Sequence, residues 1–304
     1  MRGAFIKWLC EQAKCDSRVV LLTADLGFSV IEPFVSQFPG QFFNIGVAEQ
    51  NMVGIAAGLA SEGFRPYTYS IGIFPTFRCA EQLRNDVDYH NLPVVTTTVG
   101  SGVTYGALGY THHAVQDLAL MRSLPNMMIG TPADPQEVRA ILDWHADNPQ
   151  PLYLRMHKAG EPNIHESLGS IRPGQLLPIY TPKRGGSRQC IVVAGMLAQK
   201  VVSILDRVRA PFPAFSLPLW GQRSRLDGRN FLDHYQDIIT VEDHLLDGGF
   251  GSWMLETAAI SGSSCRIHPV TLPPASVGAV ASEATLLTPV MDSLEKQITM
   301  FAGA

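Results

Sequence analysis

Apolar runs alternate with helical patterns along the first half of the chain. Five runs rich in β-branched residues predict buried strands, at 18–25, 65–74, 92–100, 126–132 and 151–156. The clearest helix between them is predicted at 134–146, where Asp134 is a natural N-cap and Pro135 fits the first helical position. This alternation predicts a parallel sheet covered by helices on both faces.

The pattern fades between residues 158 and 188, which are rich in glycine and proline and predict a linker. Alternation then resumes, with strands predicted at 189–195, 237–243 and 266–272 and helices at 196–208, 252–260 and 289–301. We therefore expect an α/β protein: a doubly wound parallel-sheet domain over 1–157, a linker over 158–188 and a smaller α/β domain over 189–304.

Charge and composition narrow the class of protein. The 304 residues carry a formal net charge of −4 and have no basic run, so nucleic acid is not an expected partner. No apolar run reaches the roughly 20 residues of a membrane span, and the charged first residues do not read as a signal peptide. The five cysteines form no C-x-x-C pair and are expected to be free thiols. We expect a cytoplasmic protein that binds no membrane and has no metal site of its own.

Polar and glycine-rich segments follow three of the predicted strands, at 24–29, 73–77 and 100–113. In open α/β sheets, ligands bind beyond the carboxyl ends of the strands. These segments therefore indicate the position of a site.

Glu49 begins a predicted helix made almost wholly of small apolar residues. One interpretation is a first-turn carboxylate that complements the helix dipole, worth about 0.3–1 kcal/mol. The other is a buried carboxylate that shares a proton with a ligand nitrogen. Phe74 and Phe77 also allow two interpretations. They could pack in the core, or they could form a surface on which a flat ring stacks.

Two further side chains are candidates for substrate contacts. His112 lies with His113 on a glycine-rich loop without metal-like spacing to a carboxylate, so a polar contact to substrate is favoured over a metal. Arg155 ends an apolar strand. From spacing alone, it fits a bidentate clamp for an anion and a structural ion pair equally well.

Four motifs in order resemble the carboxy-terminal half of transketolase: TADLGFS, NIGVAEQNMVGIAAGLASEG, IFPTF and GYTHHAVQDLALMRSLPNMMIGTPAD. The likeness covers nearly the whole chain and implies a pyrimidine-binding domain of thiamine diphosphate enzymes followed by the transketolase C-terminal domain. It implies that Glu49 binds a ring nitrogen of the cofactor aminopyrimidine and is catalytic. It also implies that Phe74 and Phe77 line the pyrimidine pocket. His112 is implied to be catalytic and to contact the substrate hydroxyls or the donor oxygen.

The resemblance places the phosphate-binding arginine at Arg155 and two further phosphate contacts at Ser29 and Arg2. Three positions depart from the family pattern, because a third pocket aromatic, an acidic residue and a second histidine are replaced by Ala80, Leu108 and Gly100. The substrates are therefore expected to differ from the usual xylulose and ribose phosphates, or to be held differently.

The diphosphate-binding motif of the family, G-D-G with a following Asn, is not found in the 304 residues. The resemblance therefore implies a split transketolase. A separate N-terminal-half subunit would bring the diphosphate and Mg²⁺ site in an α₂β₂ assembly, which transfers a two-carbon ketol unit from a phosphorylated ketose to an aldehyde. The alternatives are a 2-oxo-acid dehydrogenase β subunit, a 1-deoxyxylulose-5-phosphate synthase-like condensing enzyme and a non-catalytic scaffold subunit.

Overall fold

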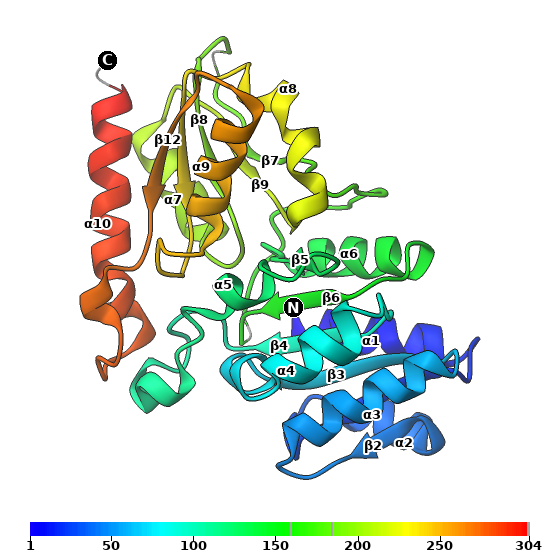
Figure 1. Cartoon of the computed structure of the whole chain (residues 1–304). Coiled ribbons are helices and arrows are strands. Elements are labelled where there is room, and N and C mark those ends of the chain that lie inside the picture. The colour runs from blue at the N-terminus through cyan, green and yellow to red at the C-terminus, as the bar shows by residue number, and fades with distance from the viewer. Residues whose placement is uncertain (159, 184, 303–304) are drawn as a thin grey trace.

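The computed structural model describes residues 1–158, 160–183 and 185–302, with only the backbone of 226–230. Two sheets stand next to each other (Figure 1). The first has seven strands in the order β10-β5-β6-β4-β3-β1-β2, and the second has five in the order β12-β11-β8-β9-β7. The predicted α/β fold with parallel sheets is confirmed.

The first sheet contains the five strands predicted in the first half of the chain and one short strand that was missed, β2. Its parallel strands are β1 (Val19–Thr23), β2 (Phe42–Asn44), β3 (Arg65–Ile71), β4 (Val95–Val99), β5 (Met128–Gly130) and β6 (Leu152–Met156). Strand β2 has three partly exposed residues at the sheet edge, so no buried apolar run marks it in the sequence.

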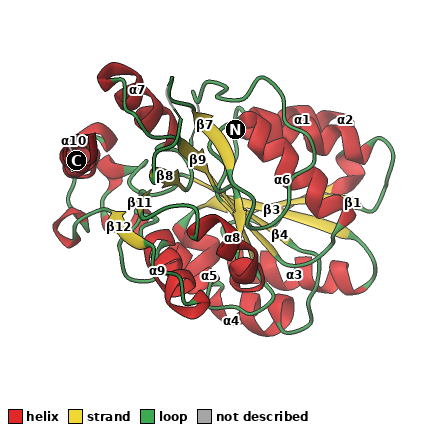
Figure 2. Ribbon diagram, turned by 90° about the horizontal axis from the view of Figure 1, so that it is seen from above, coloured by secondary structure: helices red, strands yellow, loops and turns green. Residues whose placement is uncertain are grey.

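Helices cover both faces of this sheet (Figure 2). One face carries α1 (Arg2–Ala13), α2 (Glu32–Gln37) and α6 (Pro135–Asp147), and the other carries α3 (Glu49–Ser61), α4 (Ala80–Gln82) and α5 (Asp117–Met121). The predicted N-cap of α6 is confirmed, because the Asp134 carboxylate accepts a hydrogen bond from the Glu137 backbone N–H at 2.8 Å.

The second sheet is parallel except at one edge. It contains β7 (Leu177–Tyr180), β8 (Gln189–Val193), β9 (Ala214–Ser216), β11 (Asp237–Val241) and β12 (Arg266–Val270), packed with α7 (Ala198–Val208), α8 (Arg229–Leu232), α9 (Phe250–Ser261) and α10 (Glu283–Ala302). Helix α10 begins six residues before the predicted start and contains Pro289.

Two strands depart from the predicted division of the chain. Strand β7, which pairs antiparallel with β9, lies inside the stretch predicted as a linker. The glycines and prolines of that stretch favoured a linker, although Leu177 and Ile179 of β7 are buried. Strand β10 (Leu219–Trp220) pairs antiparallel with β5, so the second half of the chain completes the first sheet. Residues 159 and 184 of the predicted linker, and 303–304 of the second domain, lie outside the described residues.

None of the described helices combines the length and the apolar content that a membrane crossing needs.

Candidate active site

Glu49 is the first residue of α3, and its side chain is buried, with 1% of the residue exposed. Its Oε2 accepts a hydrogen bond from Nη1 of Arg78 at 2.5 Å. Its Oε1 is buried without a hydrogen-bond partner among the described residues. A buried carboxylate oxygen without a donor is costly. The carboxylate therefore has one oxygen fixed within the chain and one available to a ligand N–H.

Phe74 lies next to this ion pair, on a π-helical turn (Phe74–Arg78) that follows β3. The Arg78 guanidinium carbon is 4.9 Å from the centroid of the Phe74 ring, and the His112 ring meets the Phe74 ring edge-on at 5.3 Å. Phe77 is 50% exposed on the same turn. In a π-helical turn, residues three apart do not share a face as they do in an α-helix, so Phe77 does not repeat the surroundings of Phe74.

His112 is brought to Phe74 by a long loop between β4 and α5, residues 100–113, which we call the His112 loop. Burial, together with the charge of neighbouring His113, lowers the pKa of His112 below its usual value of 6.5. The imidazole is therefore neutral at pH 7. Its Nδ1 lies 2.9 Å from the Thr111 hydroxyl, so Nε2 is the ring nitrogen left for a substrate oxygen.

Tyr105 is a site residue that the sequence analysis missed. Its ring centroid lies 6.3 Å from that of His112, and the Lys158 ammonium stands 5.6 Å from the Tyr105 centroid. Gly100 has a φ of +84°, and a Cβ there would lie 2.1 Å from the Tyr105 ring. A side chain at position 100 would therefore collide with Tyr105, and Leu108, which is 55% exposed, lies further along the loop.

Arg155 is the last residue but one of β6, is 3% exposed and lies among buried carboxylates. Its Nε donates to Asp117 at 2.7 Å, its Nη1 to Asp243 at 2.5 Å and its Nη2 to the carbonyl of Ala114 at 2.8 Å. Although burial opposes the charge, the two carboxylates raise the pKa of Arg155 above its ordinary value. Of the two interpretations left open by the sequence, the geometry favours the structural ion pair.

Lys158, three residues further on, has an exposed side chain. The sequence analysis did not single it out, because it lies at the start of a stretch predicted as a linker. A lysine two residues after the end of a central strand is the signal that was available.

Ser29 lies in the loop after β1, and Arg2 is the first residue of α1. Ser29 has a φ of +64°, and its backbone N–H donates to the Glu32 carboxylate at 2.6 Å. Burial raises the pKa of Tyr69 to about 12, although the nearby positive charge of Arg2 favours a lower value. Burial also raises the pKa of Tyr105, and the Arg2 charge again opposes the rise. Arg2 Nε is buried without a hydrogen-bond partner among the described residues, so this guanidinium has an unused donor close to the His112 loop.

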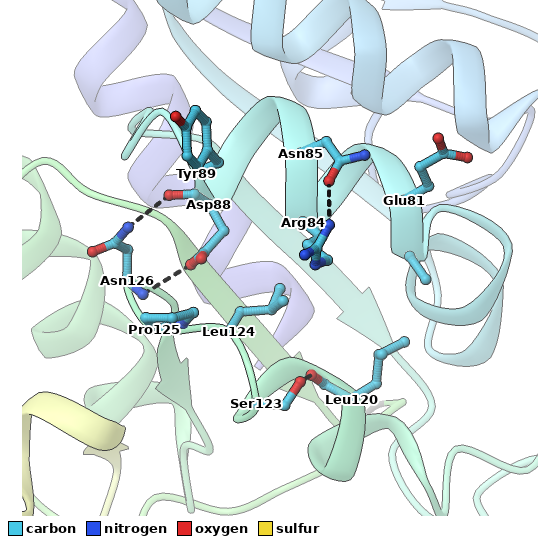
Figure 3. A pocket seen from close by; sticks show the side chains of 11 residues that line it. Glu81, Arg84, Asn85, Asp88, Tyr89, Leu120, Ser123, Leu124, Pro125 and Asn126 are labelled. Atoms are coloured by element: carbon cyan, nitrogen blue, oxygen red, sulfur yellow. Dashed lines mark hydrogen bonds between the residues drawn. The ribbon is translucent and has the colours of Figure 1, made fainter.

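A separate hollow of about 780 Å³ lies between the helical stretch after α4 and the loop after α5 (Figure 3). Its wall includes buried Asp88, which accepts a hydrogen bond from the Asn126 backbone N–H at 2.9 Å, and Arg84, which donates to Asn85 at 2.7 Å. None of the site residues predicted from the sequence lines this hollow. Across the described part of the chain, no group of three or more His, Cys, Asp or Glu side chains is arranged so that it could hold a metal ion.

Comparison with known proteins gives one family. The model of the transketolase pyrimidine-binding domain matches residues 1–161. A subunit of the apulose-4-phosphate transketolase of Phocaeicola vulgatus is 32% identical over 277 residues, which cover 88% of this chain and 86% of that protein. The 1-deoxy-D-xylulose-5-phosphate synthase of Neisseria meningitidis is 32% identical over 267 residues, covering 85% of this chain and 40% of that protein.

Among solved structures, a split-gene transketolase described as an inactive β4 tetramer matches with a TM-score of 0.80 and 28% identity, over 98% of this chain and 97% of that one. The similarity to a separate transketolase chain therefore extends along nearly the whole of this chain. The chain belongs to the transketolase family, with the pyrimidine-binding domain in its first half.

Proposed function

We propose that this chain is one subunit of a split, thiamine diphosphate-dependent transketolase, which transfers a two-carbon ketol unit from a phosphorylated ketose to an aldehyde. The observation that carries the proposal is Glu49: a buried carboxylate with one oxygen held by Arg78 and the other without a donor, next to the Phe74 ring.

The free Oε1 of Glu49 fits the N–H that a protonated ring nitrogen of an aminopyrimidine presents, and Phe74 offers an aromatic surface beside it. Arg78 fixes the rotamer of Glu49, so the accepting oxygen is held in place before the ligand arrives. When bound, thiamine diphosphate supplies the nucleophilic carbon that adds to the ketose carbonyl and holds the two-carbon unit. Glu49 would control the protonation state of the pyrimidine ring through this one hydrogen bond.

The remaining contacts would come from the carboxyl ends of β4 and β6. Neutral His112 can donate from Nε2 to the donor oxygen or accept a proton from a donor hydroxyl. Lys158 is an exposed cation whose ammonium stands 5.6 Å from the centroid of the Tyr105 ring, and it would bind the donor phosphate. Arg2 and Ser29, carried over from the resemblance, would add phosphate contacts from the loop after β1 and the start of α1.

A separate subunit would close the pocket and bring the diphosphate and Mg²⁺ site, in an α₂β₂ assembly. The rim around Glu49 suits such a partner, because Val47 is 76% exposed and Phe77 is 50% exposed. Gly54 and Gly58 of α3 have open space where a Cβ would stand, so another backbone can approach this helix closely. The relatives named as single subunits of a transketolase and the split-gene structure support the same arrangement.

The test is reconstitution. This chain, a candidate diphosphate-binding subunit, and the mixture are each incubated with thiamine diphosphate, Mg²⁺ and an aldehyde, using apulose 4-phosphate, xylulose 5-phosphate and fructose 6-phosphate as donors. We expect ketol transfer in the mixture only, and none when the chain carries Glu49→Gln. Full transfer by this chain alone would contradict the need for a partner. Undiminished transfer by the Glu49→Gln mixture would favour the scaffold alternative.

A second candidate is condensation of a decarboxylated 2-oxo acid with an aldehyde, because a 1-deoxy-D-xylulose-5-phosphate synthase is 32% identical over 85% of this chain. Exposed Leu108, in place of the family's acidic residue, leaves the recognition of the donor hydroxyl open to change. Release of CO₂ from pyruvate by the mixture, with no transfer from any ketose, would establish this candidate. If reduction of a dye accompanied the CO₂ without condensation, the 2-oxo-acid dehydrogenase alternative would apply.

A further inference from the structure

Two glycines of the His112 loop, Gly102 and Gly106, lie in close contact with residues of the second half of the chain. A Cβ on Gly102, which has a φ of +57°, would lie 2.4 Å from Oδ2 of Asp243. A Cβ on Gly106 would lie 2.6 Å from the Ala281 carbonyl oxygen and 2.7 Å from Leu286 Cδ1. Neither position can carry a side chain unless the loop moves away from its support.

The second of these supports is the stretch that leads into α10, residues 279–286, which we call the α10 entry segment (Figure 1). It also lies close to Gly109, where a Cβ would meet Val280 at 3.2 Å. Leu286 and Leu287 pack into the core of the second sheet. The segment is therefore anchored on its far side while its near side contacts the loop.

A line of polar contacts joins the same elements. Glu283, the first residue of α10, lies 2.8 Å from Nε2 of His157 and accepts a longer hydrogen bond, at 3.4 Å, from Thr104 in the His112 loop. The other ring nitrogen of His157 lies 2.8 Å from Glu161. His157 directly precedes Lys158, so the entry segment contacts both of the elements that bring polar groups to the proposed donor site.

His157 and its carboxylate partners stabilise one another in their charged forms. Burial disfavours a charged His157, but its hydrogen bonds to Glu161 and Glu283 outweigh burial and raise its pKa to about 9. Hydrogen bonds from His157 and from the N-terminal amine of Met1 lower the pKa of Glu161 to about 2 despite its burial. At neutral pH His157 is therefore an imidazolium that forms one ion pair with Glu161 and a second with Glu283 of α10.

We propose that the second domain acts as a positioning element for the active site: the α10 entry segment, through the Gly106 contact and the Glu283–His157 pair, holds His112 against Phe74. This inference rests on the proposed function for the role of His112. Gly106, Glu283 and His157 are positioning residues, because none of them contacts Glu49 or Phe74 among the described interactions.

A purely structural role for these contacts predicts a different result. If they only join the two domains, weakening them lowers the free energy of unfolding but leaves folded molecules with an unchanged His112. If they position the loop, His112 loses its contacts with Phe74 and Tyr105, while Glu49 and Arg78, on α3 and the π-helical turn, keep theirs.

The test uses two variants of the full chain, Gly106→Ala and the milder Glu283→Gln. The matched controls are Gly169→Ala, at an exposed glycine with open space around it, and Glu295→Gln, on the exposed part of α10. Histidine-labelled protein is titrated by NMR, with the His112 signal assigned from a His112→Gln variant. The donor KM, kcat and the thiamine diphosphate affinity are measured in the mixture with the partner subunit.

We expect both test variants to move the His112 pKa back toward 6.5 and to lower kcat at least tenfold, while cofactor affinity changes less than twofold. Both controls should match the wild type. An unchanged His112 titration in both folded test variants would overturn the inference, even if stability falls. The NMR readout needs no turnover, so a shifted His112 pKa in a protein without ketol transfer would retain the positioning and reject only the proposed function.

Discussion

Replacing Arg155 tests whether this side chain holds the structure together or binds a substrate anion. In Arg155→Met, an apolar side chain of comparable length fills most of the space but removes the guanidinium. Two buried carboxylates, Asp117 and Asp243, then each lose the hydrogen bond from Arg155, at 2.7 and 2.5 Å, and the Ala114 carbonyl loses one at 2.8 Å. Asp117 keeps one hydrogen bond, from the Tyr153 hydroxyl at 2.6 Å.

The loss of folding free energy in Arg155→Met depends on the burial of Arg155 and of its two carboxylate partners. Asp117, Asp243 and Arg155 are each almost completely buried, so water cannot replace the lost contacts. Breaking such a pair by removing one partner costs about 3–5 kcal/mol, because an uncompensated charge remains. At a urea slope of about 3 kcal/mol/M, the unfolding midpoint should fall by about 1–2 M.

Urea unfolding is followed by far-UV circular dichroism and tryptophan fluorescence, with Arg207→Met as the control. Arg207 pairs with Glu295 at the surface, with side chains 61% and 50% exposed, so its removal should cost under about 1 kcal/mol. A double-mutant cycle adds Asp243→Asn. In a chain that already carries Asp243→Asn, Arg155→Met should lower the free energy of unfolding by less than it does in the wild type. If Arg155→Met unfolds like the control and instead raises the donor KM selectively, the ion-pair interpretation is wrong and Arg155 is a substrate clamp.

Three further predictions concern the site and its support. Glu49→Gln should lower kcat in the reconstituted enzyme about 10²-fold or more, since it removes the carboxylate proposed to control the protonation of the pyrimidine ring; a steady-state assay showing full activity would contradict this role. Lys158→Gln should raise the KM of a phosphorylated donor about tenfold, in line with about 1.5–3 kcal/mol for a hydrogen bond to a charged group, and leave an unphosphorylated donor unaffected; an equal effect on both donors would argue against a phosphate contact. Because the folded pKa of His157 is about 9 against an ordinary 6.5, its stabilisation of up to about 3 kcal/mol is complete below pH 6.5 and lost as pH rises through 9. The difference between the urea midpoints at pH 6.5 and 9.5 should therefore be smaller in His157→Gln than in the wild type, and an unchanged pH dependence in that variant would refute the assignment. The remaining difference includes the N-terminal amine, which pairs with Glu161 and titrates in the same range.

Strands with long buried runs could be predicted from the sequence, and short edge strands could not. β1, β3, β4 and β6 each bury almost every residue, so a continuous apolar run marks them. β10 has two residues and exists because it pairs with β5, a contact between positions about 90 residues apart. No local pattern records such a pairing.

The candidate site was predictable where chemistry and local sequence coincide. Glu49 stands out as a carboxylate in an apolar helix, and the structure buries it with an unpaired oxygen. Arg155 was ambiguous because its partners, Asp117 and Asp243, come from other parts of the chain. Tyr105 was missed because its role depends on the space left by Gly100, which only the folded loop makes visible.

The most direct test of the shared cofactor site is calorimetric titration of thiamine diphosphate with Mg²⁺ into this chain alone and into its mixture with the candidate diphosphate-binding subunit. We predict binding in the mixture only, and markedly weaker binding when the chain carries Glu49→Gln. Tight binding to this chain alone, or undiminished binding by the Glu49→Gln mixture, would contradict the central claim that Glu49 completes a cofactor site shared between two subunits.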